Sequence, residues 1–207
     1  MGSAPPIAAP RQRGRPAAAS RQDVLEAARR KFLACERVDV QEIAGELGLA
    51  RATVYRWFGS RDGLLGEVLA ADFLTNYRGA RERVRSHGAL AVLETLDLLA
   101  RLLARSEPLG AFLRKEEGRA VRLLTSCAGP VHATVVTAVQ ELIEREARES
   151  GYYPPIRPPT LAYALVRLSE AFIYNDAVGS IRGEVDRLVE VQAALLGIAA
   201  PKPRRRG

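Results

Sequence analysis

The stretch 43-IAGELGLARATVYRWFGSRDGLL-65 joins two short helical patterns through a tight link that contains a glycine. Its second half, residues 51–58, gathers Arg, Thr, Tyr and the only Trp of the chain. Val54 and Phe58 are four residues apart, so they form one apolar edge that can anchor a helix. Surface helices favour Glu and Lys and core helices favour Leu and Ala, so this segment is typical of a helix that contacts a partner.

Two capped helical patterns frame the turn. Ser20 begins a predicted helix over 20–34, with an acidic residue at the capping-box position. Asp39 begins another over 39–50, and Gly48 suits the left-handed residue that ends a helix. A helix, a three-residue turn containing Gly and a further helix form the helix-turn-helix pattern of DNA-binding proteins. The alternative, a short amphipathic helix with a solvated face, is disfavoured by the two capped helices before it.

A recognition helix presents its N-terminal side chains to base edges, where Arg binds guanine and Thr or Ala contacts thymine. Tyr and Arg also suit phosphates, and Ser60 caps a following helix whose amides add a phosphate site. The arm 11-RQRGRP-16 can enter an A·T-rich minor groove, unless it is a solvated tail without function. The predicted DNA contacts are Arg51, Ala52, Thr53, Tyr55, Arg56, Arg61, Arg13 and Arg15.

The charge distribution also favours a polyanionic partner. Residues 1–65 hold 11 Arg/Lys and 7 Asp/Glu, whereas residues 66–200 hold 16 and 17. The excess positive charge therefore lies at the front of the chain and in the tail PKPRRRG.

Residues 20–69 resemble the DNA-binding domain of the tetracycline-repressor-like (TetR) regulators. The match lies in a helix with Phe32 and in IAGELGLARATVYRWFGSRDGLLGEVL. This stretch is similar to the family pattern of Ile-Ala, a Gly turn, Thr-x-Tyr, an aromatic pair and Ser-basic-acidic-x-Leu-Leu. The resemblance implies that Thr53 and the two residues before it read bases, while Tyr55 and Arg61 grip phosphates.

The chain departs from the family pattern at two places. Ala50 stands where the family usually has a capping Ser or Thr, and the link from Phe32 to Ile43 is shorter than usual. That short link and the stretches RLLTS, GPV and LAYALVRLSEAFIYNDA are similar to the quorum-signal-degradation repressor (QsdR-like) subgroup. This likeness implies a lactone or acyl-lactone effector.

The sequence predicts an all-α protein. It consists of a disordered basic N-terminal arm (1–19), a three-helix helix-turn-helix domain (20–66), a helical effector-binding and dimerisation domain (67–200) and a basic tail (201–207). In the third part, helical periodicity covers residues up to about 86, 89–106, a short helix from Pro108, 120–126, 131–150 and 160–178.

The 160–178 segment is apolar nearly all round, so its helix needs two partners. One partner is its own core, and the other is predicted to be a second subunit, in an isologous four-helix interface with the 131–150 helix. The alternative is a central helix in a monomer. The predicted interface residues are Val135, Val139, Leu142, Leu161, Leu165, Leu168 and Phe172.

An aliphatic interior with a few polar groups is typical of a ligand site. In the 160–178 helix, polar residues with spacings of 4, 3 and 4 could orient a carbonyl or lactone, unless they lie on the surface or at the dimer rim. His132 follows Pro130 and has no evident partner in the sequence. The predicted ligand contacts are Tyr77, Leu99, Leu103, Phe112, Tyr163, Arg167, Glu170 and Tyr174.

Other function classes find little support. The sequence holds two His and two widely separated Cys, without a phosphate loop, so we expect no enzyme, no cofactor and no metal site. It has neither a signal-peptide core nor an apolar run of spanning length, which predicts a soluble cytoplasmic protein with no membrane partner. The expected function is a homodimeric repressor that binds a palindromic operator in double-stranded DNA and leaves it when a small effector binds. The alternative is an architectural or partner-controlled DNA-binding protein without an effector.

Overall fold

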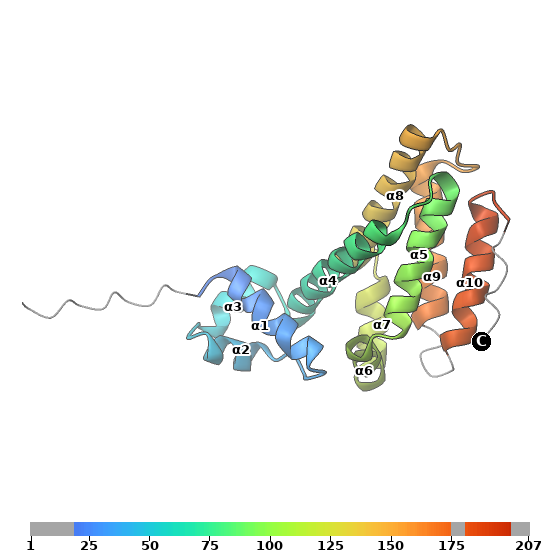
Figure 1. Cartoon of the computed structure of the whole chain (residues 1–207). Coiled ribbons are helices and arrows are strands. Elements are labelled where there is room, and N and C mark those ends of the chain that lie inside the picture. Colours follow the sequence, from blue (N-terminus) through green and yellow to red (C-terminus); the bar gives the residue numbers. More distant parts are fainter. Residues whose placement is uncertain (1–18, 175–180, 200–207) are drawn as a thin grey trace, which may run out of the picture.

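The computed structural model describes residues 19–174 and 181–199, and within these residues the chain forms ten helices and no strand (Figure 1). A small head of three helices is joined by one long helix to a bundle that holds the remaining helices. The helices are α1 (Arg21–Leu33), α2 (Val40–Glu46), α3 (Arg51–Phe58), α4 (Arg61–Arg83), α5 (Gly88–Ala104), α6 (Glu107–Lys115), α7 (Glu117–Thr125), α8 (Pro130–Ser150), α9 (Pro158–Tyr174) and α10 (Ile181–Leu195).

The helix caps and the turn of the head form at the residues that the sequence predicts. Ser20 and Asp23 form a reciprocal capping box at the start of α1. The carboxylate of Asp39 accepts from the backbone N–H of Gln41 at 2.7 Å, which caps α2. Gly48 has a φ of 63°, a left-handed value that a side chain would oppose, so glycine permits the sharp turn between α2 and α3.

The hydrophobic core of the head continues into the bundle. Val24, Ile43 and Val54 are almost completely buried between α1, α2 and α3. The same cluster continues into Phe112 of α6 and Leu124 of α7. The head therefore packs against the base of the bundle as well as against α4.

Helix α4 runs without a break through the predicted domain boundary at residue 66. Gly66 is buried where α4 crosses α8, and a Cβ added there would lie 2.9 Å from the ring of Pro130. Since one rigid helix belongs to both parts, a movement of α4 in the bundle carries the head with it.

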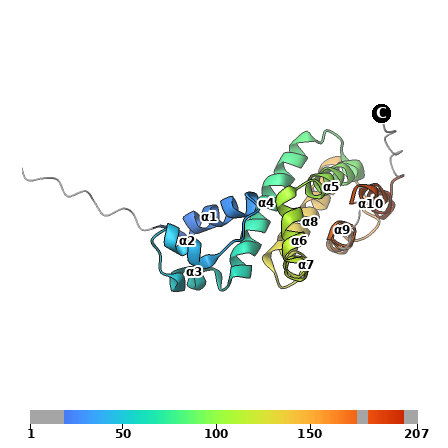
Figure 2. The same cartoon turned by 90° about the horizontal axis from the view of Figure 1, so that it is seen from below.

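The bundle is built around α8, which packs against α4, α5 and α9 (Figure 2). Helix α10, absent from the sequence-based assignment, covers the far side of α5 and α9. Leu188 and Ala193 of α10 are completely buried there.

Burial within a single chain overturns part of the predicted dimer interface. Four of the proposed contacts are at most 1% exposed within a single chain, so their side chains cannot face a second subunit. The second apolar face of α9 is covered by α10, where Leu168 and Phe172 pack beside Val185 and Leu188. Val135 is half-buried among the hydrophobic clusters of its own chain. The four wrongly assigned residues are Val139, Leu142, Leu161 and Leu165.

Several predicted segments lie outside the described residues. These are the basic arm with Arg13 and Arg15, the end of the predicted 160–178 helix beyond Tyr174, and the tail 201–207. No helix in the described part of the chain is long and apolar enough to cross a membrane.

Candidate functional site

The outer face of the head is formed by α3, which Val54 and Phe58 anchor in the core. Arg51, Ala52 and Arg56 are exposed, as the apolar edge predicts. This arrangement leaves the N-terminal end of α3 open to a partner.

Two of the predicted contact residues hold each other in place. Arg51 donates from Nη2 to the hydroxyl of Tyr55 at 3.3 Å, and its guanidinium lies 5.3 Å from the centre of the Tyr55 ring. Thr53 is half-buried in the first turn of the helix. Ala50 provides no side-chain cap, as its residue type predicts, so the first amides of α3 rely on other partners.

The arginines and lysine of the head divide into two groups. Arg21, Arg29 and Lys31 are engaged by carboxylates, at 2.6 Å from Glu67, 2.8 Å from Asp72 and 3.0 Å from Glu46. The second group makes no ion pair within the described residues, which leaves its charge for another partner. Its members are Arg30, Arg37, Arg51 and Arg56.

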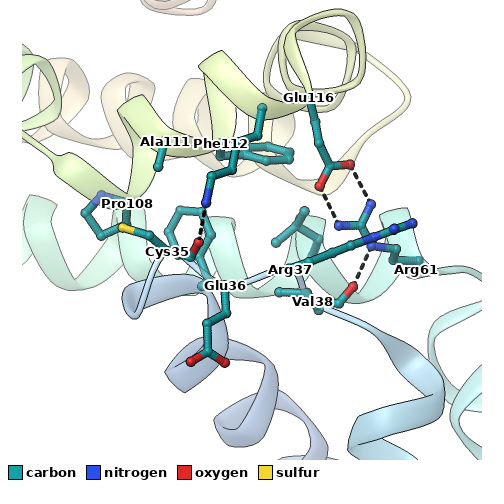
Figure 3. A pocket seen from close by; sticks show the side chains of 12 residues that line it. Cys35, Glu36, Arg37, Val38, Arg61, Pro108, Ala111, Phe112 and Glu116 are labelled. Atoms are coloured by element: carbon teal, nitrogen blue, oxygen red, sulfur yellow. Dashed lines mark hydrogen bonds and ion pairs between the residues drawn. The ribbon is translucent and has the colours of Figure 1, made fainter.

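The side chain of Arg61 does not point out toward DNA, although the sequence predicted that it contacts a phosphate. Its Nη atoms donate to both carboxylate oxygens of Glu116 at 2.7 Å, and its Nε donates to the carbonyl of Val38 at 2.5 Å (Figure 3). Its side chain is only 15% exposed. Arg61 thus bridges the head and the bundle instead of being held out toward a phosphate, because a carboxylate distant in sequence lies opposite it. The bidentate bond from Arg61 also lowers the pKa of Glu116.

A small cavity of about 50 Å³ lies inside the bundle, and most of its lining is apolar. Four of the eight predicted ligand contacts reach it: Leu99, Leu103, Glu170 and Tyr174. Contributions from α4, α7 and α8 complete the wall, including Phe73, Leu124 and Val135.

The other four predicted ligand contacts lie elsewhere. Tyr77 stacks on Phe73 along α4, and Phe112 meets Phe32 edge-on at the base of the head. The side chain of Tyr163 is 46% exposed, and Arg167 reaches over the surface end of the bundle. Spacing alone could not separate inward from outward positions, because α9 has neighbours on more than one side.

Glu170 is the main polar group of this cavity, and sequence analysis missed its principal partner. His132 Nδ1 lies 2.6 Å from one carboxylate oxygen, and Arg167 donates to the other at 2.6 Å. Arg167 also donates to the carbonyl of Thr125 at the end of α7. Only the chain fold brings α8 and α9 together, so no local signal marked His132.

Tyr174 lies one turn after Glu170 on α9 and also lines the cavity. Burial raises the pKa of its hydroxyl, and the nearby Glu170 carboxylate acts in the same direction. The hydroxyl therefore stays protonated at neutral pH and can donate to a carbonyl. The cavity thus offers an acid that can accept a hydrogen bond and a phenol that can donate one.

Two family models match this chain. One, described as the C-terminal domain of tetracyclin repressor-like proteins, matches residues 87–197, and one described as bacterial regulatory proteins of the tetR family matches residues 24–68. The chain belongs to the TetR family. The family assignment confirms the predicted all-α fold with its N-terminal helix-turn-helix domain. It also confirms the prediction that the protein is a DNA-binding transcriptional regulator and not an enzyme.

Solved structures of TetR-family proteins resemble the chain over most of its length. The transcriptional repressor QsdR from R. erythropolis is 28% identical with a TM-score of 0.81, and the match covers 87% of this chain and 96% of QsdR. This similarity agrees with the predicted likeness to QsdR. The TetR-family repressor AlkX from Dietzia sp. strain DQ12-45-1b is 24% identical with a TM-score of 0.57, covers 86% of this chain and 98% of AlkX, and supports the fold alone. A comparison with curated proteins gave no match.

Proposed function

We propose that this TetR-family protein is a repressor that leaves its operator when a small, largely apolar ligand enters the cavity of the bundle. The observation that carries the proposal is that one cavity wall belongs to α4, through Phe73, and α4 also carries the head. A ligand in this cavity therefore acts directly on the helix that orients the DNA-binding surface.

The size of the cavity supports a coupled movement. At about 50 Å³ it is far smaller than the roughly 300–1,000 Å³ of ordinary ligand pockets. A ligand must therefore separate the packed side chains around it, and close-packed helices shift as units when their contact is opened. The ligand stabilises the opened form only by its difference in affinity for the two forms.

The polar groups define the ligand chemistry. An apolar chain suits the aliphatic walls, a carbonyl suits the Tyr174 hydroxyl, and an N–H or O–H group suits Glu170. An acyl lactone with an amide link combines all three features. This chemistry supports the lactone class, and the likeness to QsdR is in line with it.

The proposed DNA surface consists of the exposed side of α3. Arg51, Ala52 and Thr53 read base edges, while Tyr55 and Arg56 contact phosphates or flanking bases. Arg61 is no longer among the proposed contacts, since Glu116 and Val38 occupy its guanidinium. Arg13 and Arg15 of the basic arm, which lie outside the described residues, remain proposed minor-groove contacts.

The proposed dimer uses a different face from the one that apolar periodicity indicates. Small or polar side chains follow the exposed sides of the two helices, at Ala133 and Thr137 on α8 and at Tyr163 and Ala171 on α9. His132 of α8 touches the ring of Tyr163 of α9 edge-on, so the two exposed stripes adjoin. Small side chains allow two such helix pairs to approach closely about a two-fold axis, which would place two heads on a palindrome.

Binding to the DNA upstream of the protein's own gene tests this function. We expect sequence-preferring, salt-sensitive binding that a member of an acyl-lactone series with graded chain lengths releases. Binding without preference for that fragment, and without release by any lactone, would instead support an architectural role.

A cavity variant links release to the proposed site. Ala100 lines the cavity, so Ala100→Leu should fill it and abolish release while DNA binding is retained. Ala71→Leu, at an exposed position of the neighbouring α4, is the matched control and should respond like the wild type. Equal ligand release in both variants would place the effector elsewhere.

A further inference from the structure

A second cavity lies outside the bundle interior, in the cleft between the head and α6 (Figure 3). Its volume is about 390 Å³, which falls in the range of small-molecule sites. The head supplies the end of α1, the loop after it and the start of α4, and the opposite wall is α6 with the residue that follows it.

The floor of this head–bundle cleft is apolar. Phe32 and Phe112 meet edge-on with ring centres 6.2 Å apart, and Leu65 lies beneath them with 1% of its surface exposed. Pro108 and Ala111 extend the same surface along α6 (Figure 3). Such a floor suits the hydrocarbon part of a ligand.

Two polar bridges cross the cleft from opposite directions. Arg61 of the head holds the carboxylate of Glu116, and Lys115 of the bundle donates to the carbonyl of Cys35 at 3.0 Å. The first bridge joins two full charges in a bidentate pair. The second joins a full charge to a neutral carbonyl, so a carboxylate would be a stronger partner for Lys115.

The lining of the cleft contains more positive side chains than its carboxylates neutralise. Both acids have cationic partners, because Glu116 binds Arg61 and Glu36 lies 3.9 Å from Lys31. Among the described residues, neither Arg37 nor Lys115 has a carboxylate partner, although both line the cleft. An anion would therefore find two cations without a carboxylate partner beside an apolar floor.

We propose that this cleft is a second ligand site, which binds a small amphipathic carboxylate with its hydrocarbon part on the Phe32–Phe112 floor and its carboxylate on Lys115 and Arg37. The bound carboxylate takes Lys115 from the Cys35 carbonyl and so removes one of the two bridges between head and bundle. The site is separate from the cavity around Glu170 and does not depend on the effector proposed for it.

Titration calorimetry of the full chain with octanoate tests the proposal, with the isosteric but neutral octanamide as the reference probe. We expect one saturable octanoate site per chain and about tenfold or more weaker binding of octanamide, because a charge-assisted hydrogen bond is lost. Lys115→Met should weaken octanoate binding by a similar factor and leave octanamide unchanged.

Two control variants make the result decisive. Arg114→Met removes the same charge from the neighbouring residue, which pairs with Glu107 outside the cleft, and should bind octanoate like the wild type. Ala100→Leu fills the bundle cavity and should also leave octanoate binding intact. The proposal is overturned by an absence of saturable binding, by equal losses in the Lys115 and Arg114 variants, or by a loss in the Ala100 variant.

Discussion

At the scale of single residues, the partners of the charged side chains decide their roles. Arg21 and Arg29 have carboxylates from α4 within 2.8 Å, so they hold the head on its helix. Arg51 and Arg56 have no such carboxylate within the described chain and lie exposed on α3. The same residue type therefore serves attachment in one place and, as we propose, DNA contact in the other.

Replacement of arginines on α3 should separate base reading from phosphate contact. Arg51→Ala should relax base preference at one operator position by about 1–3 kcal/mol. Arg56→Ala should weaken binding to all sequences and reduce the slope of log K against log salt by about one. Fluorescence anisotropy with operator variants across a salt series measures both effects.

Arg148→Ala is the control for this experiment, since Arg148 is exposed near the end of α8, far from α3 in Figure 1. It should leave DNA binding unchanged. If the Arg51 and Arg56 variants gave the same uniform loss, the assignment of Arg51 to base reading would be wrong.

The Arg61–Glu116 pair should give stability a specific pH dependence. The pKa of Glu116 is lowered in the folded chain, so its contribution is present above its ordinary value of 4.5 and is lost as the pH falls through the lowered value. At pH 7, Glu116→Gln should therefore lower the free energy of unfolding by about 1–2 kcal/mol. Urea unfolding at pH 7 and at pH 3 measures the change.

As the pH falls from 7 to 3, the difference between the wild type and the Glu116→Gln variant should shrink, because the contribution of the ion pair is lost as the pH falls through the lowered pKa of Glu116. The neighbouring Glu117→Gln is the control, since Glu117 is exposed and makes no ion pair in the described structure. A difference of the same size at pH 7 and at pH 3 would point to altered packing instead of the lost charge.

At the scale of elements, the junction of α3 and α4 depends on a glycine within the first turn of α4. A Cβ added at Gly63 would lie 2.0 Å from the carbonyl oxygen of Phe58, a distance that real atoms do not adopt. The atom in the way is backbone, so it cannot move without shifting the end of α3. The sequence pattern Gly-Ser-Arg-Asp-Gly thus sets how the recognition helix sits on α4.

Gly63→Ala should lower the free energy of unfolding by about 2 kcal/mol or more, although alanine is the better helix former. Gly45→Ala is the matched control, because a Cβ at that helical position of α2 meets nothing within 4 Å. It should raise stability by about 0.5–1 kcal/mol. Thermal and urea unfolding of the two variants should move in opposite directions, and a shared stabilisation would refute the predicted clash.

At the scale of the whole molecule, the proposed function needs two heads at a fixed spacing. The apolar faces of α8 and α9 pack within the subunit. Association of two subunits must therefore use the small and polar residues that stay exposed. Such an interface is governed by shape, which makes it sensitive to long charged side chains at its centre.

Thr137→Arg should therefore dissociate the proposed dimer and weaken operator binding at least about tenfold, since each half-site would bind separately. Glu82→Arg, at an exposed position near the end of α4, is the control and should remain dimeric. Sedimentation velocity gives the oligomeric state. A wild-type chain that sediments as a monomer, or a Thr137→Arg variant that stays dimeric, would exclude this face.

The sequence by itself determined the features that rest on contacts between near neighbours. The caps at Ser20, Asp39 and Ser60, the turn at Gly48 and the apolar edge of α3 all lie within a few residues of their partners. Short-range hydrogen bonds and helical periodicity specify them, so the head and its recognition helix could be predicted.

Only the tertiary structure decided what depends on residues distant in the chain. Arg61 was predicted to contact a phosphate, but Glu116, 55 positions away, binds its guanidinium, so Arg61 bridges the head and the bundle. Helix α10 turned the second face of α9 from a dimer surface into core, and His132 gained Glu170 as its partner. Periodicity shows that a face is buried, but only the packed chain shows what buries it.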